Sequence, residues 1–183
     1  MFSIPPRGAL LVLTVLLIAA AILDIRYRRI PNWLTMGGVV AGLLLNSFIG
    51  PPEGGLLYSL AGLGGAFAVY LFLYVLRAMG AGDVKLMAAV GSLVGLERWF
   101  GVFFVTAIVG GIMALLLVLV RGRAKKTLWN VGFILNEMRF GRAAYVTRDE
   151  LDVRSGKAVG LPHGAVIAVG TIFYIAISAR LTL

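Results

Sequence analysis

Long apolar runs separated by short polar stretches dominate the chain. An α-helix rises about 1.5 Å per residue, so crossing about 30 Å of hydrocarbon takes roughly 17–25 apolar residues. Five runs reach or approach that length, and the last is slightly short but carries no charge. The pattern therefore predicts an all-α polytopic membrane protein. The five expected helices cover residues 8–25, 33–49, 56–76, 100–120 and 164–179.

A sixth expected helix, residues 79–96, differs from the others because it carries charges. Its uncharged part, residues 86–96, is too short to cross a membrane alone. Asp83 and Lys85 lie just before that part. The segment can span only if both side chains face protein or a wet cavity rather than lipid.

The distribution of basic residues tests the six-helix interpretation. With six crossings, fourteen Lys and Arg residues fall on one side of the membrane and three on the other. Because cytoplasmic loops carry the excess of basic residues, both termini are expected outside, in the periplasm. Without the 79–96 helix, the nine basic residues of segment 121–162 would move to the far side. The charges thus favour six transmembrane helices in one domain, 1–183, of a multi-pass inner-membrane protein.

Two segments allow a second interpretation. The first run resembles a signal peptide in length, but only Arg7 precedes it, whereas Arg26, Arg28 and Arg29 follow it. That charge order is typical of a stop-transfer helix whose amino terminus is outside. Segment 121–162 mixes apolar and basic residues and predicts a helix lying on the cytoplasmic membrane surface. Contact with a substrate is the alternative for this segment.

Composition excludes several classes of protein and site. The chain is 60% hydrophobic and 14% charged, whereas soluble domains hold about 25% charged residues. It has no cysteine and one histidine, which argues against thiolate catalysis and against Cys- or His-rich metal centres, so no metal or cofactor is expected. The net charge of +9 is assigned to cytoplasmic loops, and no nucleic-acid partner is expected. Any chemistry must rest on carboxylates, hydroxyls or lysines.

Asp24 and Asp83 are the candidate catalytic residues. Asp24 closes the first apolar run and Asp83 lies near the start of the expected helix 79–96, so six-helix topology puts both near the cytoplasmic face. An ionised side chain at membrane depth costs about 3 kcal/mol, which makes such an acid a functional candidate. Two nearby carboxylates share a proton, and that state suits peptide hydrolysis. The alternative is that each acid pairs with a neighbouring cation, Asp24 with Arg26 or Arg28 and Asp83 with Lys85.

The residues beside the two acids are suited to a close-fitting site. Gly80 and Gly82 leave room for the backbone to turn and for a substrate strand to approach Asp83. Pro31 is placed to start the second helix without losing a hydrogen-bond donor, and Asn32 can help to cap it.

These residues resemble the type IV prepilin peptidases, which are membrane aspartyl proteases with a Gly-x-Gly-Asp motif. Asp24, with Pro31 seven residues later, is similar to the family's first catalytic aspartate and its downstream proline. The family's motif around its second catalytic aspartate includes a lysine that follows the aspartate. The segment of this chain that is similar to it is Gly80-Ala81-Gly82-Asp83-Val84-Lys85-Leu86. The start of the family's last helix resembles Leu161-Pro162-His163-Gly164. The resemblance covers about residues 10–120 and 160–180.

The resemblance implies removal of a short basic leader from a prepilin or pseudopilin at the cytoplasmic face. Asp24 and Asp83 would be catalytic, and Gly80, Gly82, Lys85 and Pro31 would shape the site. Lys85 would either stabilise ionised Asp83 or contact substrate, or act as an interfacial counter-ion. His163 stands where the family usually has an aromatic residue, and we expect it to pack or cap rather than catalyse.

One departure from the larger members of this family bears on activity. Those members carry an amino-terminal domain with paired Cys-x-x-Cys motifs and also methylate the processed pilin. This chain has no cysteine and begins almost directly with its first apolar run. It therefore resembles the short, peptidase-only branch associated with Flp-type (tight-adherence) pili. The competing interpretations are a small transporter or proton-coupled channel, with the two acids as a relay, and a non-catalytic assembly factor.

Overall fold

The computed structural model describes residues 7–48, 55–122, 124–140 and 161–181. Seven α-helices account for nearly all of these residues. Their bounds are α1 Arg7–Tyr27, α2 Asn32–Phe48, α3 Gly55–Val75, α4 Ala81–Val94, α5 Leu96–Val120, α6 Ala124–Arg139 and α8 His163–Leu181. The prediction of an all-α protein is confirmed.

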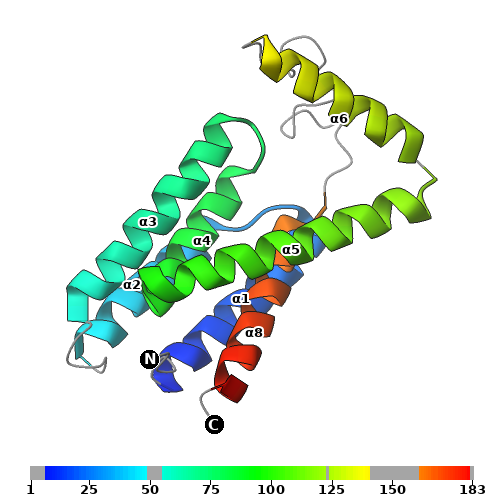
Figure 1. The fold of residues 1–183 in the computed structure, drawn as a ribbon. Coiled ribbons are helices and arrows are strands. Elements are labelled where there is room, and N and C mark those ends of the chain that lie inside the picture. Colours follow the sequence, from blue (N-terminus) through cyan, green and yellow to red (C-terminus); the bar gives the residue numbers. More distant parts are fainter. Residues whose placement is uncertain (1–6, 49–54, 123, 141–160, 182–183) are drawn as a thin grey trace.

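Helix α4 lies at the centre of a bundle of six helices. Helices α2 and α3 pack along it, while α1 and α8 lie side by side and α5 crosses the bundle beside α8 (Figure 1). Every residue of α4 from Asp83 to Val94 is buried except Lys85. The core therefore forms around α4, with Leu86, Met87, Val90 and Leu93 fully enclosed.

Among the described residues, four helices are long and apolar enough to cross a membrane, namely α1, α3, α5 and α8. Helices α2 and α4 have 17 and 14 residues, which at 1.5 Å per residue is about 26 and 21 Å. Both are shorter than the roughly 30 Å of hydrocarbon that a lone helix has to cross. Helix length thus supports four membrane-crossing helices, and it does not determine the six-helix topology or the orientation of the termini.

Helix α4 is shorter than the expected 79–96 because a glycine stands at each end. Gly95 has a φ of +76°, and its N–H donates to the carbonyl of Gly91. Helix α5 then begins at Leu96, four residues before the expected start. Glu97, which the expected helices 79–96 and 100–120 leave in the connection between them, lies instead in the first turn of α5.

Small residues let α3 and α4 approach closely. A Cβ added to Gly62 would lie 2.1 Å from the carbonyl oxygen of Gly91, and one added to Gly91 would lie 2.3 Å from that of Gly62. Side chains at either position would force the helices apart. Gly65 faces Leu96 in the same way, with 2.3 Å to its Cδ1, whereas Gly64 faces open space.

A buried polar cluster joins α2, α3 and α4 near the ends where the chain termini lie. The Asn46 amide nitrogen donates to Ser59 Oγ at 2.8 Å and to the carbonyl of Ser92 at 2.9 Å. Ser59 Oγ in turn lies 3.1 Å from the carbonyl of Gly42 and 2.8 Å from that of Ser92. Such hydrogen bonds between helices fix how they pack in a low-dielectric interior.

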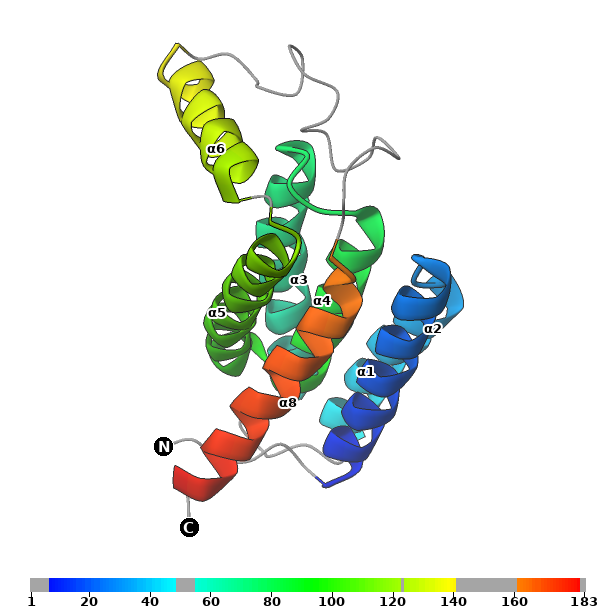
Figure 2. The ribbon, with the colours of Figure 1, turned by 90° about the vertical axis from the view of Figure 1, so that its right-hand side faces the viewer.

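Helix α6 stands apart from the bundle at the end opposite the chain termini (Figures 1 and 2). It contacts the end of α5, and Leu128 and Trp129 are largely exposed. The sequence predicted a helix in this segment, and a helix forms there over Ala124–Arg139. Most of the rest of segment 121–162 lies outside the described residues.

Candidate active site

Asp24 is held in the last turn of α1 by the start of α8. Its side chain is only 9% exposed. The backbone N–H of Gly164, the second residue of α8, donates to Asp24 Oδ2 at 2.7 Å. The amide groups at a helix N-terminus favour negative charge, so α8 supports a carboxylate at this position. Arg28, four residues on, adopts a φ of 54° and ends α1.

Asp83 is the third residue of α4 and is also buried, with 8% of its surface exposed. Its Oδ2 accepts a hydrogen bond of 3.2 Å from the backbone N–H of Gly80, the residue that precedes the helix. The side chain thereby folds back over the first turn of its own helix. Asp83 therefore lies within the first turn of α4 and Asp24 lies beside the first turn of α8, and each acid has one oxygen held by a backbone amide.

The two carboxylates belong to one site. Asp83 interacts electrostatically with Asp24 and also with His163, the first residue of α8. Tyr70, on α3, is buried and lies within electrostatic reach of Asp83 as well. Residues from α1, α3, α4 and α8 thus surround one buried acidic site at the end of the bundle that faces α6 (Figure 1).

Ile30 fills the space between the starts of α4 and α8, beside the two acids. A Cβ added to Gly82 would lie 3.3 Å from Ile30 Cβ, and one added to Gly164 would lie 3.0 Å from Ile30 Cδ1. The connection between α1 and α2 therefore inserts one apolar side chain between the N-termini of α4 and α8. Larger residues at Gly82 or Gly164 would collide with it.

Lys85 takes a different direction from Asp83. Two residues along an α-helix correspond to a rotation of about 200°, which turns Lys85 away from the acids. Its Nζ donates to Asn32 Oδ1, at 2.8 Å. Asn32 had been expected to help cap α2. It is instead the first residue of α2, and the carbonyl of Pro31, just before the helix, accepts from the N–H groups of Leu34 and Thr35.

The predicted site residues thus fall into two groups. The first group is formed by the buried acids Asp24 and Asp83 together with Gly80 and Gly82. The second group, Lys85 and Pro31, lies beside the first turn of α2. The resemblance had placed Gly164 and His163 only at the start of the last helix.

The structure adds three features of the site that the sequence did not identify. They are the amide of Gly164, the packing of Ile30 and the nearness of Tyr70. Tyr70 carried no signal of its own, because an aromatic residue within an apolar helix is ordinary.

Comparison with known proteins adds independent support for the motif interpretation. The model of the type IV leader peptidase family matches residues 11–115, which include both Asp24 and Asp83. The chain belongs to this family. No solved structure matches it.

Several relatives carry the name prepilin leader peptidase/N-methyltransferase. The protein from Neisseria gonorrhoeae is 30% identical over 119 residues, which are 62% of this chain and 41% of that protein. The Bacillus subtilis protein is 33% identical over 116 residues, covering 61% of this chain and 45% of the relative. The Klebsiella pneumoniae protein is 36% identical over 99 residues, or 51% and 42%. The chain thus matches less than half of the length of each relative.

Proposed function

We propose that this member of the leader peptidase family is a membrane-embedded aspartyl endopeptidase that uses Asp24 and Asp83. The observation that carries the proposal is the buried site in which these two carboxylates interact, each with one oxygen held by a backbone amide. Two acids in a low-dielectric site share a proton, so that one is ionised and the other protonated.

That protonation state supports hydrolysis of a peptide bond. The ionised carboxylate takes a proton from a water molecule, whose oxygen attacks the scissile carbonyl carbon. The protonated carboxyl donates its proton to the carbonyl oxygen as negative charge develops there. Collapse of the tetrahedral intermediate breaks the C–N bond, and the leaving amine takes up a proton. The two acids exchange roles over the cycle.

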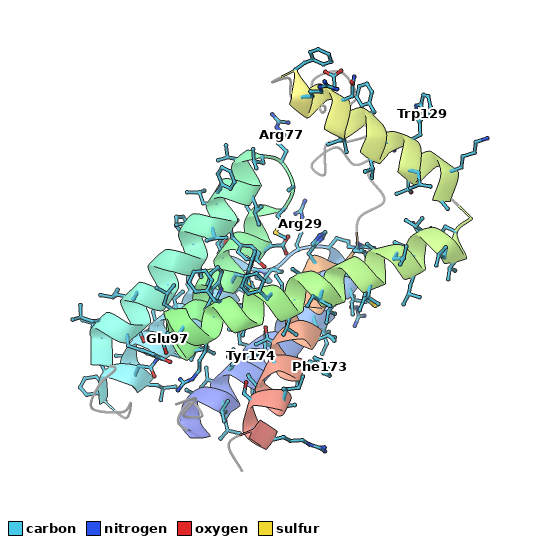
Figure 3. The ribbon with its side chains drawn as sticks, in the orientation of Figure 1. Arg29, Arg77, Glu97, Trp129, Phe173 and Tyr174 are labelled. Atoms are coloured by element: carbon cyan, nitrogen blue, oxygen red, sulfur yellow. The ribbon has the colours of Figure 1, made fainter. Side chains whose placement is uncertain are left out.

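We assign six membrane-crossing helices, α1 to α5 and α8, with both termini in the periplasm. Arg29 and Arg77 lie at the end of the bundle near α6, whereas Glu97 lies at the other end (Figure 3). Basic residues favour the cytoplasmic side. The short helix α4 needs no hydrophobic length of its own, because it is buried among other helices rather than exposed to lipid. The acidic site then lies at the cytoplasmic border of the inner membrane.

The substrate that fits this position is a prepilin or pseudopilin with a basic leader. Its apolar helix lies in the bilayer and its leader stays in the cytoplasm, so the scissile bond meets the acids without extraction of the helix. The prepilin leader peptidase names of the relatives support this substrate class. We expect no methyl transfer by this chain, because it lacks the cysteines of the Cys-x-x-Cys motifs.

The test is cleavage by the purified chain in liposomes. A prepilin-type protein with a basic leader and an apolar helix is added during reconstitution, with S-adenosylmethionine present, and the products are weighed by intact-mass spectrometry. The expected result is one cut at the junction of leader and helix, with no added methyl group. A transporter or an assembly factor would leave the substrate intact, and a methylated product would contradict the second part of the proposal.

A further inference from the structure

A groove of about 350 Å³ lies on the side of α4 that is turned away from the acids. Its walls are Met36 and Val39 of α2 and Leu63 and Phe67 of α3, and Ala88 of α4 lines it between them. These walls are apolar. From Asn32 to Val39 along α2 the groove runs about 10 Å, at 1.5 Å per residue.

One end of the groove is polar. Asn32 and Lys85, which are joined by the hydrogen bond of 2.8 Å, line the groove at the end of the bundle that holds the acids. A lysine ammonium has three donors, and the bond to Asn32 uses one of them. The groove therefore combines apolar walls with a cation at one end, which the topology proposed above puts at the cytoplasmic membrane surface.

A second groove of the same volume provides a contrast. It lies between α1 and α2, is also about 350 Å³, and is lined by residues such as Leu11, Val15, Trp33 and Gly37. None of its lining residues is charged. The two grooves thus have the same volume and mainly apolar walls. The amine of Lys85 distinguishes the α2–α3–α4 groove from the α1–α2 groove.

We propose that the α2–α3–α4 groove binds one anionic phospholipid. The acyl chain lies along Met36, Val39, Leu63 and Phe67, and the phosphate accepts hydrogen bonds from Lys85. Cations at the cytoplasmic surface attract anionic headgroups, and the apolar groove fixes where the lipid lies. This site goes beyond the proposed peptidase activity and does not depend on it.

The charge of the groove favours a lipid over the substrate. The leader of the proposed substrate is basic and would be repelled by Lys85, which lines the groove. An anionic headgroup is attracted by the same amine, and an acyl chain packs on the apolar walls.

The experiment is native mass spectrometry of the full chain released from nanodiscs of equal phosphatidylglycerol and phosphatidylcholine. One bound lipid is expected, with phosphatidylglycerol preferred about fivefold, the effect of one basic residue at an anionic surface. Lys85→Gln should abolish the preference and Lys85→Arg should keep it. Arg29→Gln removes an exposed charge at the same end but outside the groove, and should leave the preference unchanged.

Further variants test where the acyl chain lies. Val39→Phe fills the groove and should reduce the retention of both lipids, whereas Gly37→Leu, in the α1–α2 groove, should not. The proposal is overturned if the wild type retains no lipid, if Lys85→Gln and Arg29→Gln behave alike, or if Val39→Phe and Gly37→Leu do. Stoichiometric displacement of the lipid by a prepilin-type substrate would also overturn it. Cleavage is measured separately, so an inactive enzyme that binds lipid refutes only the proposed function.

Discussion

The backbone N–H of Gly164 donates to Asp24 Oδ2 across 140 residues of sequence, at 2.7 Å. This bond joins the last turn of the first helix to the first turn of the last helix. It fixes one oxygen of Asp24 and leaves the other to react. The orientation of Asp24 therefore depends on the position of α8 as much as on α1.

Gly164→Ala tests this dependence. The added Cβ would lie 3.0 Å from Asp24 Cβ and 3.1 Å from its Oδ2, so the carboxylate has to move. A displacement of about 1 Å in an active site can cost 100-fold in rate, and we expect cleavage to fall about 10- to 100-fold. Gly64→Ala is the matched control, because its Cβ meets nothing within 4 Å. Equal rates for the two variants would contradict the role of α8.

Ile30→Ala tests the packing between the starts of α4 and α8. Loss of this side chain leaves a gap where Ile30 contacts the positions of Gly82 and Gly164, and both acids lose lateral support. We expect cleavage to fall about tenfold or more, in line with the cost of small misplacements. Ile22→Ala removes the same atoms from an exposed position on α1 and should leave the rate near that of the wild type.

Gly91→Ala tests the close contact of α3 and α4. Its Cβ would lie 2.3 Å from the carbonyl oxygen of Gly62, which is backbone and cannot rotate away. Overpacking of this kind costs about 1–3 kcal/mol or more, so the unfolding temperature in detergent should fall. Gly62→Ala should have a similar effect. The double variant should cost less than the sum of the two, because helices already forced apart by one Cβ leave room for the other. Full additivity would show that the two glycines do not face each other.

Ser59→Ala tests the polar cluster of α2, α3 and α4. Ser59 Oγ accepts from the Asn46 amide, at 2.8 Å, in a buried position. Its loss should lower stability by about 1 kcal/mol, a typical value for a hydrogen bond between membrane helices. Ser47→Ala is the control, since that exposed hydroxyl bonds only to the carbonyl of Leu43 in its own helix. A loss of cleavage without a loss of stability would be inconsistent with a purely structural cluster.

The positions of the helices could be predicted from the sequence because hydropathy is a local property. The expected runs 8–25 and 56–76 became Arg7–Tyr27 and Gly55–Val75, which differ by one or two residues at each end. The family was likewise recognisable, since its motifs lie within short segments around Asp24 and Asp83. The largest difference is at the start of α5, which begins at Leu96 rather than at residue 100, because Gly95 alone separates it from α4.

Contacts between distant segments could not be predicted from one sequence. Lys85 had been considered as a partner of Asp83, the nearest acid in the chain, but its Nζ bonds to Asn32, 53 residues away. Gly164 and Tyr70 lie near the acids but belong to other helices, α8 and α3. The apolar pattern of each helix predicts that the helix is buried, but not which residues it contacts. These contacts depend on how each helix is rotated about its axis and how the helices pack, and the hydropathy pattern determines neither.

The most direct test of the acid pair is the cleavage rate of Asp24→Asn, Asp83→Asn and the double variant, each purified folded in lipid. Acids that act as a unit give non-additive losses. We therefore expect each single variant to lose at least about 1,000-fold, and the double variant to be no slower than either. Glu97→Gln, which changes an exposed acid at the other end of the bundle, should retain activity. Substantial cleavage by either folded single variant would contradict the account.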